Sequence, residues 1–159
     1  LGDTIAGRRN RMGDGTGSRT GAELGRWSRR SDTMRVQYHF RSSERGLLAW
    51  DVRKLLELTD GLPVEEIPLS DICELDEPFW FELGGEAPTC RSIAGHATLI
   101  RDADLSYPIV VDPDGRVMDG MHRVCKALIE GANRIPAYRL VELPDPDSIG
   151  VRAEDLPYD

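Results

Sequence analysis

The chain has 159 residues, of which 40% are hydrophobic and 30% are charged, and its formal net charge at pH 7 is −8. This length suits one domain of ordinary size, and the composition is typical of a globular protein. No stretch approaches the 18 consecutive apolar residues of a membrane span, and the first ten residues lack the apolar segment of a signal peptide. The three cysteines are far apart and predict neither a disulfide framework nor a zinc site, so we expect a reduced, cytoplasmic setting.

The charge is unevenly distributed along the chain. Residues 1–45 hold ten arginines against five acidic residues, whereas residues 46–159 hold 10 basic and 23 acidic side chains, a net charge of −13. Such an acidic body repels DNA and anionic membranes. Residues 1–33 are rich in glycine and arginine, with little to bury. We interpret them as an over-long gene assignment or expression remnant, with Met34 as the true start, or as a disordered linker. Both interpretations are preferred to a third, a basic arm that binds nucleic acid.

Residues 34–63 form the first segment with regular patterning. Residues 34–40 alternate apolar and polar side chains, which predicts a short strand. Ser42 or Ser43 can cap a helix running to Thr59, and Asp60 to Pro63 would end that helix. Four apolar residues recur at helical spacing within it, namely Leu48, Val52, Leu55 and Leu56. We interpret this helix as a docking element without chemistry of its own.

Residues 64–143 carry the patterns of a small α/β (α+β) domain. Strands are predicted at 64–75, 109–112, 116–119 and 135–141, with a Pro-Asp-Gly turn at 113–115. Thr89 can cap a helix from Arg91 to about Asp104, with Ile93, Ala97 and Leu99 or Ile100 facing inward. A second helix runs from His122 or Arg123 to Glu130 and ends at Gly131; its predicted buried residues are Val124, Cys125, Leu128 and Ile129. This order predicts a mixed sheet with flanking helices, followed at 144–159 by an acidic, proline-rich tail that wraps the surface or frays.

The stretch from Val117 to Arg123 is the most informative part of the sequence, because a strand ends there in Asp119-Gly120 and a helix begins. Glycine lets the backbone approach a ligand closely, and a helix start presents unpaired N–H groups to an anion. Arg123 adds a guanidinium for phosphate oxygens, and His122 can move a proton near neutral pH. Asp119 can hold Mg²⁺ or accept a proton. An ordinary strand–turn–helix with Arg123 paired to a surface acid remains the alternative.

The run from Ser92 to Leu140 (SIAGHATLIRDADLSYPIVVDPDGRVMDGMHRVCKALIEGANRIPAYRL) resembles the ParB/sulfiredoxin-type domain, and IPLSDI at 67–72 resembles its first strand. The resemblance covers about residues 65–141 and implies the fold of that family in a bacterial, cytoplasmic protein. It also implies that Gly120, Met121, His122 and Arg123 contact the phosphates of ATP, ADP or CTP bound with Mg²⁺. Asp119 resembles the aspartate of the kinase-like Asp-Gly-x-His-Arg form.

Departures from the family narrow the implied activity. Met121 stands where sulfiredoxin needs its cysteine, and a thioether cannot do that chemistry. ParB proper needs a DNA-binding domain after this one, whereas only 18 residues follow Val141, and that stretch has an acidic character. We therefore expect a nucleotide- or phosphate-binding domain; as an enzyme it would be a small-molecule phosphotransferase or a nucleotide hydrolase. A non-catalytic regulatory or protein-binding module, and nucleic-acid binding through the arginine-rich leader, are the alternatives.

The acidic stretch between Glu74 and Glu86 supplies the remaining candidates. Glu74 and Glu77 directly follow a predicted strand and are candidates for a general base or for contact with an acceptor. Arg91, near a helix start, can face the same ligand. The simpler interpretation is that these acids form a solvated loop face and that the aromatic residues 79–81 anchor the loop. His96 is interpreted as a surface or structural histidine.

Overall fold

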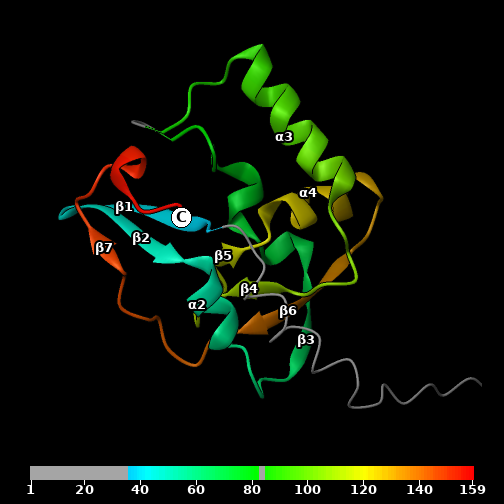
Figure 1. Ribbon diagram of the computed structural model, residues 1–159. Coiled ribbons are helices and arrows are strands. Elements are labelled where there is room, and N and C mark those ends of the chain that lie inside the picture. The colour runs from blue at the N-terminus through cyan, green and yellow to red at the C-terminus, as the bar shows by residue number, and fades with distance from the viewer. Residues whose placement is uncertain (1–35, 83–84) are drawn as a thin grey trace, which may run out of the picture.

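The computed structural model describes residues 36–82 and 85–159, which form two β-sheets and three α-helices (Figure 1). The strands are β1 (Tyr38–Ser43), β2 (Gly46–Asp51), β3 (Val64–Pro68), β4 (Ile109–Val111), β5 (Val117–Asp119), β6 (Arg134–Arg139) and β7 (Ser148–Ile149). The helices are α2 (Val52–Glu57), α3 (Cys90–Asp102) and α4 (Met121–Ile129), and 3-10 turns cover Leu69–Asp71, Cys73–Asp76 and Ala153–Asp155. The interpretations of residues 1–33 and of Met34 as a start lie outside the described residues.

The four-stranded sheet has the order β3-β6-β4-β5 and is mixed, as the sequence predicted. β4 pairs parallel to β6 and antiparallel to β5, and β3 pairs antiparallel to β6. Helix α4 packs on this sheet through Met121, Val124 and Ala127, which join the main core cluster with residues of β4 and β6. Burying each large aliphatic side chain there stabilises the fold by roughly 1.5–3 kcal/mol. The small α/β fold class is therefore confirmed.

The three-stranded sheet, with the order β1-β2-β7, corrects the helix predicted from Ser42 or Ser43 to Thr59. Only its second half is helical, because α2 begins at Val52 and is capped by Asp51, whose carboxylate accepts from the Arg53 amide. The first half is a β1–β2 hairpin turning at Gly46, which has φ 98°. The helical spacing was misleading because β2 and α2 bury side chains in one shared cluster, which contains Trp50, Val52, Leu55, Leu56 and, at its edge, Leu48.

The end of one strand and the buried face of one helix also differ from the predictions. The strand predicted over 64–75 ends at Pro68, after which the chain forms two 3-10 turns. The amide of Leu69 donates to the carbonyl of Asn133 instead of extending the strand, so the chain turns away from the sheet there. In α4 the predicted burial of Val124 is confirmed, but Leu128 and Ile129 are 53% and 74% exposed.

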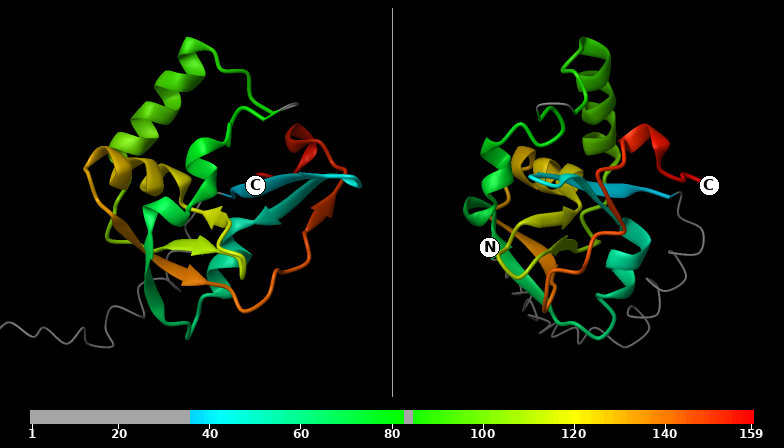
Figure 2. Two further views of the ribbon diagram at one scale, coloured as in Figure 1. Left: turned by 180° about the vertical axis from the view of Figure 1, so that it is seen from behind. Right: turned by 90° about the vertical axis from the view of Figure 1, so that its left-hand side faces the viewer.

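Helix α3 is confirmed in position, and its cap is Thr89, whose hydroxyl accepts from the Ser92 amide. The predicted inward face is wrong, because α3 buries none of its residues and Ile93 and Leu99 are half exposed. Figures 1 and 2 show α3 projecting from the sheets, with its C-terminal end near α4. Lys126 of α4 fixes that end by donating to the carbonyls of Arg101 and Ala103. This end of the helix is therefore fixed to α4.

The C-terminal segment wraps the surface, which was one of the two alternatives predicted for residues 144–159; the other was fraying. The indole of Trp50 donates to the carbonyl of Pro144 at 2.8 Å, and Asp147 accepts from the Asp51 amide and pairs with Lys54. β7 then adds a short strand beside β2, and Leu156 is buried. Within residues 36–82 and 85–159, no helix has both the length and the apolar character needed to cross a membrane.

Candidate functional site

The junction between β5 and α4 is built around Gly120, which has a left-handed backbone (φ 103°) and forms the N-cap of α4. A β-carbon at this position would lie 2.6 Å from Arg123 Nη2 and 2.7 Å from Ile109 Cγ2, so only glycine fits without displacing its neighbours. No side chain caps the helix. The amides of Arg123 and Val124 donate to the Gly120 carbonyl, which leaves Met121 and His122 with amides that have no partner inside the helix.

The guanidinium of Arg123 lies across this glycine. Its Nη2 forms an ion pair with Asp119 Oδ2 at 2.8 Å, and the two side chains are 17% and 21% exposed. Its Nε is buried and has no hydrogen-bond partner among the described residues. The structure thus brings Asp119, Gly120 and Arg123 together as the sequence suggested, but it pairs the arginine with the aspartate of the same motif. Met121 is buried in the core and contributes only backbone to the junction.

His122, the second residue of α4, is half-buried beneath an aromatic side chain. Burial lowers its pKa to about 4, with a further lowering from the nearby His96 and a partly opposing effect of Asp119. The imidazole is therefore neutral near pH 7. A neutral imidazole can donate one hydrogen bond and accept another, but it adds no positive charge to the junction.

Trp80 covers both histidines with one indole ring. Its ring centroid lies 4.2 Å from that of His96 and 4.7 Å from that of His122, with interplanar angles of 20° and 18°. His96 Nδ1 lies 2.9 Å from His122 Nε2, and His96 Nε2 lies 3.1 Å from a carboxylate oxygen of Glu86. A continuous chain of hydrogen bonds thus runs from Glu86 through His96 to the start of α4.

This arrangement was not predicted, because its members come from three separate segments. His96 was interpreted as a structural or surface histidine, and it is indeed only part-buried, yet it contacts the one histidine of the motif. Nothing local in the sequence around His96 marks this contact, since it depends on how α3 packs beside α4. The sequence signal that could have suggested it was the presence of one histidine in a predicted helix (His96), another in the motif (His122) and aromatic residues in the loop at 79–81.

Glu74 and Glu77 lie at the other end of β5 and have structural partners. Glu74 is buried, accepts from the Val117 amide at 2.8 Å and pairs with Arg116 at 3.1 Å. Glu77 forms two hydrogen bonds with Arg116, and these hold the pKa of its carboxyl below the usual value. No described hydrogen bond or ion pair joins either acid to the β5–α4 junction. Both carboxylates fasten the start of β5 to the preceding 3-10 turn.

The remaining ligand candidates have no built site in the structure. Arg91 is exposed in the first turn of α3, and no hydrogen bond or ion pair in the described part of the chain joins it to the junction. Among residues 36–82 and 85–159, no group of three histidine, cysteine or acidic side chains is placed to hold a metal ion. Asp119, the residue predicted to bind Mg²⁺, is engaged by Arg123. The described residues therefore do not fit a metal site of their own.

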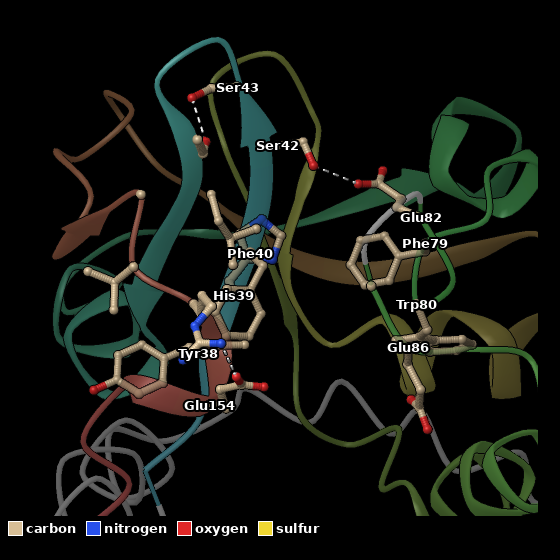
Figure 3. A pocket seen from close by; sticks show the side chains of 17 residues that line it. Tyr38, His39, Phe40, Ser42, Ser43, Phe79, Trp80, Glu82, Glu86 and Glu154 are labelled. Atoms are coloured by element: carbon tan, nitrogen blue, oxygen red, sulfur yellow. Dashed lines mark hydrogen bonds and ion pairs between the residues drawn. The ribbon is translucent and has the colours of Figure 1, made fainter.

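A cavity of about 960 Å³ lies beside this site, between β1 and the segment that carries Trp80 (Figure 3). Tyr38 and Phe40 of β1 line one side, and Phe79 and Trp80 line the other. Glu86 also lines it, so the hydrogen-bonded chain to His122 begins at the cavity. Neither Gly120 nor Arg123 lines this cavity.

Comparison of the chain with protein-family models, with curated proteins and with solved structures gave no match in any of the three.

Proposed function

We propose that the chain binds a phosphate group, carried by a nucleotide or another phosphoester, at the β5–α4 junction. The observation that carries the proposal is the guanidinium of Arg123, which lies at a glycine-capped helix start with its Nε buried and unpartnered. The unbonded amides of Met121 and His122 and the helix dipole favour an anion at the same place. The resemblance to ParB/sulfiredoxin-type domains, whose members bind nucleotide phosphates at the matching turn, agrees with this geometry.

Binding requires an exchange of partners at Arg123. The arginine now balances Asp119, so an arriving phosphate competes with that carboxylate for the guanidinium. His122 is neutral and its Nε2–H faces His96, so its remaining nitrogen, Nδ1, is an acceptor and adds neither a charge nor a donor for the phosphate. We therefore propose that phosphate binds with modest affinity. That affinity is set by how much more favourably Arg123 pairs with the phosphate than with Asp119. In a phosphotransferase, the hydrogen-bonded chain from Glu86 to His122 would carry the acceptor's proton away from the junction.

Thermal unfolding with inorganic pyrophosphate, ATP and CTP, beside the bare nucleosides, tests the proposal. A ligand at 100 times its Kd stabilises the folded state by about 2.7 kcal/mol, which raises Tm by several degrees in a chain of this size. We expect stabilisation by the phosphate compounds but not by the nucleosides. Arg123→Ala abolishes it, whereas Arg101→Ala, at an exposed arginine of α3 that also pairs with an aspartate, retains it.

Asp119→Asn separates the proposal from a purely structural role of Arg123. Removing the competing carboxylate leaves the guanidinium free, so we expect phosphate binding to become about five- to tenfold tighter. If Arg123→Ala keeps the stabilisation, or if Asp119→Asn weakens it in a folded protein, the junction is not the phosphate site. Release of inorganic phosphate from a bound nucleotide then distinguishes an enzyme from a binding module.

A further inference from the structure

The cavity beside the junction has aromatic walls that face one another. Figure 3 shows Tyr38 and Phe40 of β1 on one side and Phe79 and Trp80 on the other. Its volume of about 960 Å³ lies at the upper end of the range for small-molecule sites. Aromatic faces attract cations, because the ring quadrupole places negative charge on the face. These walls favour a ligand with a positively charged group.

The charged residues around the cavity favour the same kind of ligand. Among the described residues that line it there are three carboxylates, from Glu82, Glu86 and Glu154, and one cation, Arg152. Arg152 is already neutralised, since it pairs with Glu154 at 2.8 Å and with Asp155 at 2.9 Å. Glu82 has only a long contact of 3.5 Å to the hydroxyl of Ser42. The cavity is therefore electronegative, and Glu82 is the carboxylate most available to a ligand.

His39 adds a hydrogen-bond donor to the lining. Its side chain is 7% exposed, and burial with the nearby Arg41 lowers its pKa to about 3, so the ring is neutral. Nε2 accepts from Arg41 Nε at 3.1 Å, which places the ring proton on Nδ1. No described hydrogen bond uses that N–H. Among the described residues only Arg123 Nε is fully buried without a partner, so the Nδ1–H of His39 keeps some accessible surface, and an acceptor atom of a ligand in the cavity can bond to it.

We propose that this cavity binds an organic cation, a guanidinium or ammonium group on a short chain that also carries a carbonyl or hydroxyl oxygen. The cation lies between the aromatic walls and pairs with Glu82 and Glu86, and the oxygen accepts from His39. This inference does not depend on phosphate binding at the β5–α4 junction, because that binding rests on Arg123 and the first amides of α4, none of which lines the cavity; Glu86 is shared only with the hydrogen-bonded chain to His122. A free metabolite and an arginine or lysine side chain of a peptide share this chemistry.

Titration of the full chain with Nα-acetyl-arginine methylamide, observed by two-dimensional NMR, tests the inference. Nα-acetyl-citrulline methylamide has nearly the same shape without the charge and serves as the matched probe. We expect the indole N–H signal of Trp80 to move with the arginine probe and to stay in place with the citrulline probe. Argininamide, a free small molecule with both the guanidinium and a carbonyl oxygen, and the peptide Gly-Gly-Arg-Gly-Gly then show whether a metabolite or a peptide side chain is the better source of the cation.

Matched variants locate the binding. Glu82→Gln and Glu86→Gln each weaken binding of the arginine probe by about fivefold or more, whereas Glu66→Gln, on the exposed face of β3, leaves it unchanged. Rising salt weakens binding of the arginine probe to the unaltered chain. Equal binding of the two probes, no binding at about 20 mM, or equal loss in all three variants would overturn the inference. Pyrophosphate binding at the junction is unaffected by any of these results, so each proposal can fail alone.

Discussion

At the scale of single residues, the β5–α4 junction holds an unusual balance around Arg123. The side chain is mostly buried; among residues 36–82 and 85–159 its Nε has no hydrogen-bond partner and its ion pair is with Asp119. Leaving a buried donor unsatisfied costs roughly 1–3 kcal/mol. The fold carries this cost at the one place where a glycine brings the backbone, a helix start and a guanidinium together. That coincidence is the reason to place a ligand there.

Gly120→Ala tests how closely the junction is packed. The left-handed backbone and the approach of Ile109 and Arg123 should together destabilise the protein by about 2–4 kcal/mol, measured by urea unfolding. Gly131→Ala is the matched control at the other end of α4, since Gly131 also has a left-handed backbone (φ 76°) but nothing within 4 Å of its added β-carbon. It should cost only about 1 kcal/mol. Equal losses in the two variants would mean that the close approach at Gly120 is not limiting.

At the scale of secondary-structure elements, the sequence correctly predicted those elements that depend on interactions between neighbouring residues. The turn at 113–115, the two strands beside it, helix α4 and its glycine stop all follow from residues that act on their immediate neighbours. Strand β2 was missed although its hairpin partner β1 is its neighbour in sequence, because its leucines fall at helical spacing with those of α2. The His96–His122 contact was equally hidden, since it arises from tertiary packing.

Helix α3 offers a prediction of its own, because Gly95 lies in its middle with nothing within 4 Å of an added β-carbon. Gly95→Ala should therefore stabilise the helix by about 0.5–1 kcal/mol. Hydrogen exchange of the α3 amides should slow by a corresponding factor of about two to five. Because α3 buries no residue, urea unfolding of the whole chain should change less than local exchange does. Faster exchange in Gly95→Ala would contradict the projecting arrangement of this helix.

At the scale of the whole molecule, a layer of aromatic rings connects the two sheets. Trp50 and His39 come from the three-stranded sheet, and His39 stacks against Phe79 at 6.2 Å between centroids. Phe79 contacts Trp80 edge to face, and Trp80 stacks on His122 of α4, which packs on the four-stranded sheet. The two histidines in this layer have lowered pKa values, so the layer is stable only while their rings stay uncharged.

The whole-molecule prediction is that stability falls between pH 7 and pH 5. Unfolded histidines titrate near pH 6.5, whereas burial lowers the pKa of His39 to about 3 and of His122 to about 4. Below pH 6.5 the unfolded chain therefore binds protons that the folded chain does not, and folding is penalised increasingly as pH falls. Carboxyls with lowered pKa values, such as that of Glu77, lose their contribution only at lower pH. With His122 partly exposed, we expect a loss of about 2–4 kcal/mol by pH 5.

Urea unfolding at closely spaced pH values from 7 to 5 measures how steeply the free energy of unfolding falls as the pH is lowered. His122→Asn removes one of the two titrating rings, so it should reduce the slope by up to half, whatever it does to stability at pH 7. His96→Asn changes the hydrogen bond to His122 without removing that ring, and so retains a steeper slope than His122→Asn does. A stability that stays flat from pH 7 to pH 5 in the unaltered chain would mean that these imidazoles are not held neutral. The aromatic layer that contains these two rings would then be open to water.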